Sequence, residues 1–391
     1  MSWEPKGLDE LGFVSRGRSR HRPRDAAHLY GGPHPFVQTG DVKHAGLYLT
    51  EYTQTYSEEG LAQSRMWPAG TLCITIAANI ADTAILGFDA CFPDSVIGFI
   101  PDENKADARF IKYLFDTLLQ RKYKQFTQGA AQDNLSQAKL LSLQFPIPGI
   151  TEQKQIADVV SAYDDLIENN RRRIQLLEQA ARLLHKEWFV HLRFPGHEHT
   201  QIIDGVPEGW EKKPLSEIAD ITMGQSPKSI YYNQDGNGLP FHQGVTNFGV
   251  RFPSHETYCT VQSRIGEPGD ILFSVRAPVG RINITHDKIV IGRGIAAIRS
   301  ICEQQNYLFY ALKSHFFKED MIGGGAIFAA ITKKDLYGVE LMQPTDRIAA
   351  MFMEHVLLID LQIVNLQQTI EKLAKARDLL LPKLMNGEVA V

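Results

Sequence analysis

The chain has 391 residues, of which 43% are hydrophobic and 22% charged, and its formal net charge is −4. This length predicts two or three domains with sizeable cores. The acidic balance excludes a generally polycationic protein, so contact with nucleic acid would require local basic surface.

The sequence predicts a soluble, cytoplasmic protein that does not enter a membrane. Residues 1–5 lack the apolar segment of a signal peptide, and four cysteines without a C-x-x-C pair indicate reduced thiols. The most apolar stretch, residues 71–88, contains Asn79 and Asp82 and is too short to span a bilayer.

The first half of the chain reads as a mixed domain followed by a long helix. Apolar runs that follow Pro and Gly turns are typical of strands that enter a core. Phe, Tyr and Leu at helical spacing predict a helix at residues 108–126, which a glycine-rich turn at 128–131 follows. A long helix is expected at residues 151–192.

This long helix begins after Pro146 and Pro148, with Thr151 as its expected N-cap. No Gly or Pro interrupts the run before Pro195, and apolar residues recur every seven positions along two lines. Two such lines over several heptads indicate one helix with a coiled-coil seam. At about 1.5 Å per residue the helix is roughly 60 Å long.

The second half repeats the first in the same order, after a linker rich in Pro and Gly. A second short helix is expected at 306–318, a glycine-rich turn at 323–326, and a second long helix from Thr345 to Leu381. The matching segments are residues 3–12 and 210–219, 35–42 and 240–246, and 68–74 and 268–273.

The two long helices are expected to pack antiparallel against each other, which would bury both apolar stripes within one chain. Leu358, Ile363 and Ile370 widen the stripe of the second helix. Asn170 and Gln362 either form a polar pair that fixes the register of the seam or face solvent. The residues expected to pair the helices are Ile156, Val160, Tyr163, Ile167, Asn170, Ile174, Leu177, Phe352, Ile359, Gln362, Leu366 and Leu373.

These patterns predict an α+β fold. Two similar globular α/β domains are separated by two long antiparallel coiled-coil helices, and a pseudo-two-fold internal repeat relates the halves. The expected parts are a first domain at 1–150, a long helix at 151–192, a linker at 193–209, a second domain at 210–343, and a long helix with a C-terminal tail at 344–391.

A search for catalytic motifs finds none. The chain lacks a P-loop, a G-x-S-x-G nucleophile turn and the Asn-Pro-Pro-aromatic motif of amino-methyltransferases. The tight cluster His197-Glu198-His199 lies in the linker and has no further ligand at metal-binding spacing. We therefore expect no catalytic residue, no metal and no cofactor in this chain. The absence of these motifs favours a binding function over catalysis.

The strongest signal for binding is a loop in which five arginines alternate with small residues and His21. Arginine suits phosphate groups and guanine edges, although the loop would also fit an acidic protein partner or simple solvation. These arginines are Arg16, Arg18, Arg20, Arg22 and Arg24.

The matching loop of the second half, residues 224–232, is less basic but rich in hydrogen-bonding side chains. The turn at 274–281 carries two arginines, whereas the matching turn at 77–83 carries none. Different polar loops on a common frame are what two different half-site readers would present. Further DNA-binding candidates are Gln38, Thr39, Asn79, Gln225, Ser226, Lys228, Tyr231, Gln243, Thr246, Asn247, Arg251, Ser274, Arg276 and Arg281.

The chain resembles the specificity subunits of type I restriction–modification systems. The resemblance covers nearly the whole chain and rests on the internal repeat together with four motifs. These motifs are Pro-Ile-Pro-x-x-Thr-Glu-Gln-x-x-Ile at 146–156, Ser-x-Arg-Ala-Pro-Val-Gly at 274–280, Gly-x-x-Gln-x-x-Leu-Ser from 129 to 136, and Leu-Pro-Lys-Leu-Met-Asn-Gly-Glu-Val at 381–389.

This resemblance implies that each globular domain is a target recognition domain, which reads one half of a bipartite, asymmetric site in double-stranded DNA. The paired helices would set the spacer between the halves and dock two methyltransferase subunits, which carry S-adenosylmethionine. A restriction subunit with motor activity can join such a complex, and this chain would itself be non-catalytic.

Two alternatives remain open at this stage. The chain could be a coiled-coil scaffold whose domains bind proteins, and salt-dependent binding to duplex DNA would separate that hypothesis from a specificity subunit. It could also be a self-sufficient DNA-modifying enzyme, which methyl transfer by this chain alone would establish.

Overall fold

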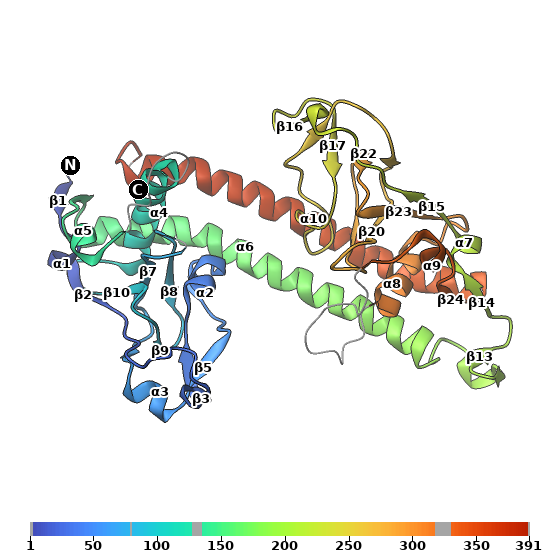
Figure 1. Cartoon of the computed structure of the whole chain (residues 1–391), viewed down its shortest axis with the longest axis horizontal. Coiled ribbons are helices and arrows are strands. Elements are labelled where there is room, and N and C mark those ends of the chain that lie inside the picture. Colours follow the sequence, from blue (N-terminus) through green and yellow to red (C-terminus); the bar gives the residue numbers. More distant parts are fainter. Residues whose placement is uncertain (1–2, 79, 127–134, 317–329, 390–391) are drawn as a thin grey trace. The chain divides into compact units, whose positions relative to one another are not determined.

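The computed structural model describes residues 3–78, 80–126, 135–316 and 330–389 (Figure 1). The chain divides into two compact units. Unit 1 comprises Met1–Arg173 with Leu366–Val391, and unit 2 comprises Ile174–Asn365. Each unit holds a mixed domain and a part of both long helices, as the predicted α+β class requires.

Unit 1 contains a five-stranded sheet in the order β2-β10-β7-β8-β4, a four-stranded sheet in the order β5-β3-β9-β6, and the pair β1-β11. Its strands are β1 (Glu4–Lys6), β2 (Gly12–Arg16), β3 (Tyr30–Phe36), β4 (Tyr48–Leu49), β5 (Gln54–Tyr56), β6 (Met66–Trp67), β7 (Leu72–Thr75), β8 (Thr83–Leu86), β9 (Ala90–Cys91), β10 (Val96–Pro101) and β11 (Phe145–Ile147). Its short helices are α1 (Leu8–Leu11), η1 (Ala27–Leu29), α2 (Thr39–His44), α3 (Glu58–Ala62), α4 (Ala108–Phe126) and α5 (Gln137–Leu141).

Unit 2 contains a four-stranded sheet in the order β15-β23-β20-β21, a five-stranded sheet in the order β16-β18-β17-β22-β19, and the pairs β14-β24 and β12-β13. Its strands are β12 (Ile202–Ile203), β13 (Val206–Pro207), β14 (Glu211–Pro214), β15 (Ala219–Met223), β16 (Tyr232–Asn233), β17 (Leu239–His242), β18 (Tyr258–Cys259), β19 (Ile265–Gly266), β20 (Ile271–Ser274), β21 (Ile282–Ile284), β22 (Ile289–Ile291), β23 (Ile295–Ser300) and β24 (Glu340–Gln343). Its short helices are η2 (Lys186–Val190), η3 (His197–His199), α7 (Leu215–Ile218), η4 (Ser229–Tyr231), α8 (Gln305–Phe316) and α9 (Lys333–Tyr337).

The two domains share one topology, which confirms the predicted repeat. The order β2-β10-β7-β8 in unit 1 reappears as β15-β23-β20-β21 in unit 2, and β3 pairs parallel with β9 as β17 does with β22. In both domains the apolar runs predicted as strands are buried along their whole length, as in β7 and β20. The helix predicted at 108–126 has those bounds, and the one predicted at 306–318 begins at Gln305.

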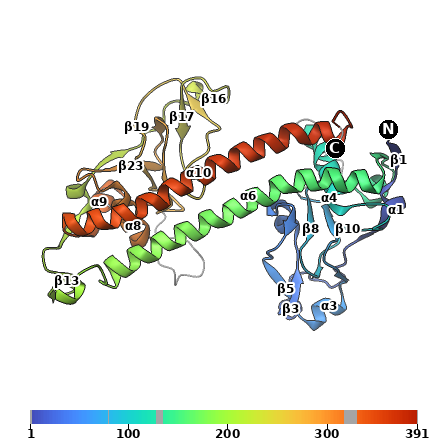
Figure 2. The same ribbon diagram turned by 180° about the vertical axis from the view of Figure 1, so that it is seen from behind.

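The two long helices are α6 (Ile150–His185) and α10 (Asp346–Met385), which lie side by side within each unit in both views (Figures 1 and 2). Helix α6 begins one residue before the predicted N-cap Thr151, because the carbonyl of Gly149 accepts the first helical bond, from Gln153 N at 3.0 Å. Helix α10 continues through Pro382 beyond the predicted end at Leu381. Its last turn is retained because Leu384 and Met385 are buried in the core of unit 1.

The helix stripes agree with most of the predicted seam. Every predicted α6 position is buried or half-buried, Asn170 included, and so are Phe352, Ile359, Leu366 and Leu373 on α10. The predictions for Gln362 and Leu358 are wrong. Both side chains are exposed, Leu358 by 64%, because the buried line of α10 runs through Val356, Ile363 and Ile370 instead. Asn170 is buried and Gln362 is exposed, so the two residues neither form a buried polar pair nor both face solvent.

Helix α10 corrects the expectation about apolar segments. By length and composition alone this helix could cross a bilayer, with a mean hydropathy of 1.5 in its most apolar window, of which 33% is buried. Its apolar residues pack into the cores of both units, and it carries Asp360 and Arg377 in ion pairs. Cys73, Cys91 and Cys259 are buried as free thiols, whereas Cys302 is exposed.

Candidate nucleic-acid interface

The arginine-rich loop of unit 1 follows β2 and is held close to the turn between β9 and β10. A Cβ atom on Gly17 would lie 2.3 Å from the carbonyl oxygen of Phe92, so only glycine fits there. The Gly17 N–H donates to Val96 O at 2.8 Å, and the side chain of Gln63 accepts from Arg20 N at 2.6 Å. The loop therefore has a defined backbone path.

Its five arginines are all exposed but fall into two classes. Arg24 forms an ion pair with Asp94 at 2.8 Å, and the Arg16 Nε donates to the carbonyl of Asp94 at 2.8 Å. Arg22 is occupied by backbone carbonyls of its own loop, including that of Ser19. Within the described residues, the guanidinium groups of Arg18 and Arg20 have no such partner, so these two are the ones free to bind a ligand.

The other candidates of unit 1 are less available. Gln38 donates from its side chain to Gln54 at 2.5 Å, and its backbone N–H donates to Asp41 at the start of α2. Thr39 is the half-buried first residue of that helix. Asn79 lies outside the described residues.

In unit 2 the loop after β15 contains Gln225, Lys228 and Tyr231, all with exposed side chains. Ser226 is half-buried, and its Oγ accepts a hydrogen bond from Arg293 N at 3.2 Å. Ser226 thus contributes to positioning Arg293, a residue that the sequence analysis missed.

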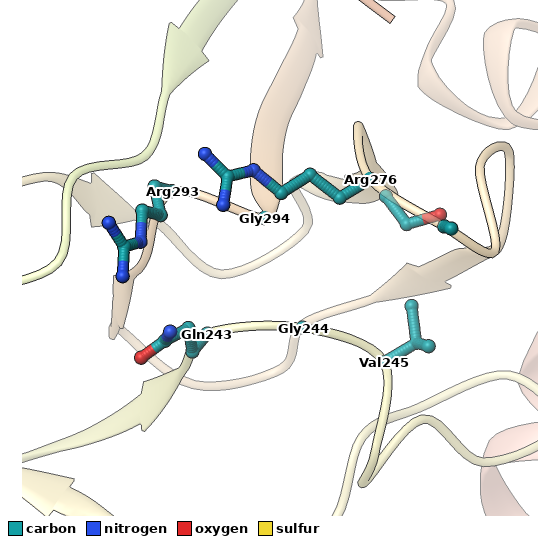
Figure 3. A pocket seen from close by; sticks show the side chains of 8 residues that line it. Gln243, Gly244, Val245, Arg276, Arg293 and Gly294 are labelled. Atoms are coloured by element: carbon teal, nitrogen blue, oxygen red, sulfur yellow. The ribbon is translucent and has the colours of Figure 1, made fainter. Parts of the chain in front are cut away.

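A small concavity opens beside this loop. Figure 3 shows the side chains of Gln243, Arg276 and Arg293 at its lining, with the two guanidinium groups directed toward the same side. All three side chains are exposed, and they come from the turns after β17, β20 and β22. The structure therefore brings together two predicted residues and one unpredicted arginine.

Two predicted readers of unit 2 are buried instead. Ser274 is 1% exposed, and its hydroxyl donates to Pro278 O at 2.6 Å and accepts from Arg281 N at 2.9 Å. Its role is to close the turn that presents Arg276, because a buried hydroxyl needs partners inside the protein. Arg281, at the end of this turn, is exposed.

The prediction that Arg251 binds DNA is also wrong, since its side chain is only 2% exposed. Its guanidinium forms ion pairs with Glu178 of α6, at 2.9 Å, and with Asp360 of α10, and it lies 4.1 Å from the ring centre of Phe309. Burial raises the pKa of Tyr310, whose hydroxyl donates to Asp360 at 2.9 Å. Arg251 therefore fastens its loop to both helices within unit 2 and is not available to DNA.

The same loop carries Thr246, which is exposed, and Asn247, which is half-buried and accepts a backbone bond from Ser254 at 2.9 Å. It is also held by a histidine pair, in which His242 lies 2.8 Å from His255. Burial and the neighbouring His255 lower the pKa of His242 to about 4, so His242 is neutral at physiological pH.

Equivalent backbone hydrogen bonds allow the two domains to be compared residue by residue. The turn between β9 and β10 in unit 1 corresponds to the turn between β22 and β23 in unit 2. The matching bonds join Arg18 N to Phe92 O and Gln225 N to Ile291 O at 3.0 Å each, and Ile76 N to Ser95 O and Val275 N to Gly294 O at 2.9 Å each.

This correspondence shows a difference in charge at equivalent positions. Both domains carry a glutamine after the parallel strand pair, but the arginines of unit 2 are replaced by a small and an acidic residue in unit 1. The equivalent pairs are Gln38 and Gln243, Ala77 and Arg276, and Asp94 and Arg293.

No catalytic or metal chemistry emerges from the described parts of the chain. They contain no group of three His, Cys, Asp or Glu side chains placed to hold a metal ion. His197 instead approaches Phe194 O at 2.8 Å and Glu198 at 3.5 Å. The arrangement offers hydrogen-bond donors and positive charge, which is the chemistry of an interface.

Comparison with known proteins gives consistent matches. A family model described as type I restriction modification DNA specificity domain matches residues 2–179 and 207–372. Two Methanocaldococcus jannaschii proteins carrying the names MjaX and MjaIX specificity subunit, of type I restriction enzymes, are 34% and 26% identical, each over 100% of this chain and 94% of the relative. The S subunit structure of a type I system from M. genitalium is similar in fold, with a TM-score of 0.58, 15% identity, and coverage of 98% of this chain and 96% of that chain.

Proposed function

The chain belongs to the type I restriction–modification DNA specificity family, and we propose that its two domains each read one half of a bipartite, asymmetric DNA sequence. As the non-catalytic DNA-recognition subunit, the chain depends on partner subunits for methylation and cleavage. The scaffold and self-sufficient enzyme hypotheses are set aside on this ground.

One observation supports this proposal above the others: equivalent loop positions in the two domains carry different side chains on the same backbone frame. Phosphate contacts fix a protein on DNA, whereas base-edge contacts carry sequence information. Arg18 and Arg20 in the first domain and Arg276 and Arg293 in the second provide donors for both kinds of contact. A site read by two such domains would have two halves of different sequence.

We further propose the parts of the chain that carry each task. The recognition domains are residues 1–150 and 210–343, joined by the linker at 193–209, and the long helices at 151–192 and 344–391 set the unread gap between the half-sites. In support, α6 and α10 each contribute residues to both units. The complex would work in the cytoplasm.

The long helices would also dock the partner subunits, two methyltransferases and, in the restricting complex, a motor nuclease. On the unit 2 part of α10, the exposed leucines Leu357, Leu358 and Leu361 form an apolar surface that the unit itself leaves uncovered. Exposed apolar patches of this kind are typical of protein–protein contacts.

The test is to co-express this chain with the methyltransferase subunit of its own system in a methylation-free host. N6-methyladenine is then mapped across the genome by single-molecule sequencing. We expect a two-part motif with a fixed gap and different bases in its two halves. A stable complex that methylates no defined sequence, or a continuous motif, would refute the proposal.

A further inference from the structure

The concavity of unit 2 has a rigid backbone. The N–H of Gly292 donates to His242 O at 2.8 Å, and that of Gly294 donates to Gln243 O at 3.1 Å. A Cβ atom on Gly292 would lie 2.9 Å from the Cα of Gln243, and one on Gly294 would lie 2.3 Å from its carbonyl oxygen. The glycines on both sides of Arg293 therefore permit a close approach that sets this arginine beside Gln243.

Arg276 is fixed from the other side of the concavity. The N–H of Val275 donates to Gly294 O at 2.9 Å, which ties the turn after β20 to the turn that carries Arg293. The buried hydroxyl of Ser274 closes the same turn. The three side chains thus project from a backbone that hydrogen bonds within the unit hold in place.

The side chains of this cluster offer hydrogen-bond donors and positive charge, so they suit a ligand with electron-rich acceptor atoms. Within the described residues, the side chains of Gln243, Arg276 and Arg293 have no hydrogen-bond or ion-pair partner, and no carboxylate is among the residues that line the concavity. Two guanidinium groups on one side of a small opening repel each other unless an electron-rich group lies between or beside them. In duplex DNA, the candidates are the O6 and N7 acceptors of guanine and the phosphate oxygens.

Three features favour a base edge over phosphate. Arginine, with its planar fork, makes the commonest specific contact to guanine, and glutamine matches the adenine edge in the same groove. An amide adjoining two arginines is a mixed set of donors and acceptors, which suits base edges, whereas phosphate needs donors only. The equivalent positions of the first domain, Gln38, Ala77 and Asp94, retain the glutamine and lack both arginines.

We infer that Arg276 and Arg293 read guanine in the half-site of the second domain, and that Gln243 contacts a neighbouring adenine. The first domain, which has Ala77 and Asp94 at the equivalent positions, reads no guanine through these two turns. This inference rests on the proposed function, and it assigns Arg293 as a specificity-determining residue of the second domain.

The test uses the complete complex with its methyltransferase and the motif found by methylation mapping. Each guanine of the motif is replaced in turn by 7-deazaguanine in a synthetic duplex, which removes N7 and keeps base pairing. We expect at least one such substitution to weaken wild-type binding roughly 5-fold or more, because the bidentate contact loses its N7 acceptor and keeps only O6. With Arg293→Ala or Arg276→Ala, the same substitution should cause little further loss.

The variants have matched controls. Lys288→Ala removes an exposed positive charge of the same domain, whose ion pair with Glu267 measures 3.1 Å, and should retain the wild-type response to each modified duplex. Arg293→Lys keeps the charge but loses the planar fork, and it should relax discrimination at the guanine while retaining most of the affinity. Circular dichroism and co-purification with the methyltransferase show that each variant is folded.

Several outcomes would overturn the inference without touching the proposed function. One is a bipartite motif without a G·C pair in the half that these variants affect. Another is wild-type binding that is indifferent to 7-deazaguanine, with Arg293→Ala weakening all sequences equally and lowering the salt dependence, which would mark Arg293 as a phosphate contact. Absence of any bipartite motif would instead refute the proposed function itself.

Discussion

The recognition loops of the two domains share a backbone frame but distribute charge in opposite ways. A Cβ atom on Gly17 or on its equivalent Gly224 would lie 2.3 or 2.2 Å from a carbonyl oxygen, so the loop after the first strand approaches its neighbour closely in both domains. In the first domain the arginines lie on this long loop, and Asp94 holds two of them. In the second domain Arg276 and Arg293 lie on short turns and have no acidic partner among the residues that the structure describes. The two domains thus share a closely packed frame and differ in the side chains that it carries.

The domains also differ in how they are fastened to the long helices within their own units. In unit 1 Asp164 of α6 accepts from Tyr113, at 2.6 Å, and pairs with Arg377 of α10. In unit 2 Asp360 of α10 accepts from Tyr310 in the same way, but its arginine, Arg251, comes from the loop between β17 and β18. The loop that carries Arg251 is therefore held to both long helices by a buried charge.

The largest effect is expected when the buried charge that holds this loop to the helices of unit 2 is removed. Arg251→Met leaves Asp360 buried without this counter-charge, whereas Glu178 keeps its ion pair with Lys313 at 2.7 Å. Removal of one partner of a buried ion pair costs about 3–5 kcal/mol. We expect this loss in unit 2 only, measured as faster amide hydrogen exchange of its core strands, with unit 1 unchanged. Lys288→Met, at an exposed ion pair, should change the free energy of unfolding by less than about 1 kcal/mol. Equal destabilisation of both units would contradict the assigned role of Arg251.

A smaller effect is expected where the second domain is most tightly packed. Gly294→Ala places a methyl group against the carbonyl oxygen of Gln243, and such overpacking costs about 1–3 kcal/mol. The displaced turn should lose base discrimination in one half-site while the other half and the gap remain, as methylation mapping would show. Gly244→Ala is the matched control, because a Cβ there has no atom within 4 Å. Identical motifs for the two variants would argue against a preorganised cluster.

Low pH should destabilise unit 2 more than unit 1. Burial lowers the pKa of His242 to about 4 and that of His185 to about 3, and both residues belong to unit 2. An unfolded histidine, with a pKa of about 6.5, takes up a proton that the folded chain does not bind, so the stability of unit 2 is complete above that pH and falls as the pH drops toward 4.

The expected loss for unit 2 is on the order of 2–3 kcal/mol between pH 7 and 5.5, about 1 kcal/mol for each histidine. His242 lies 2.8 Å from His255, which in turn lies 3.0 Å from Asp287. Urea unfolding read by hydrogen-exchange mass spectrometry gives the stability of each unit. His199→Ala, at an exposed histidine, should leave the pH profile of unit 2 unchanged. A profile without any loss over this range would show that His242 and His185 are not neutral in the folded chain.

The smallest effect is expected in the first domain, when the ion pair between Asp94 and Arg24 is removed. Asp94→Asn removes the ion pair with Arg24, whose side chain is 48% exposed, so stability should change by less than about 1 kcal/mol. The released guanidinium should strengthen non-specific DNA binding and increase the salt slope of log K by about 1. Titrations at several salt concentrations measure this slope. A salt slope identical to that of the wild type would mean that Arg24 does not reach DNA.

Much of the fold follows from local sequence patterns. Heptad spacing located the buried stripe of α6, and helical spacing gave the bounds of α4, because both depend on residues near in sequence. The register error at Leu358 and Gln362 arose where α10 is apolar on several faces, so periodicity alone left the buried line undefined.

The candidate interface was less predictable, because it depends on contacts between distant segments. Nothing local distinguishes Arg251 as buried, since its partners Glu178 and Asp360 lie 73 and 109 positions away. Ser274 was predicted to contact DNA because the local sequence does not show that its side chain is buried. Arg293 could have been found, since an arginine between two glycines at the junction of two apolar runs indicates a tight, exposed turn.

If each domain reads its own half of the DNA site, substitutions in the two domains should alter different halves of the methylation motif. Methylation motifs are mapped for the complex with Arg18→Ala and Arg20→Ala together in the first domain, and separately with Arg293→Ala in the second. We expect each variant to relax or lose bases in a different half of the motif, with the gap unchanged in both. Changes by both variants in the same half, or in both halves alike, would contradict it.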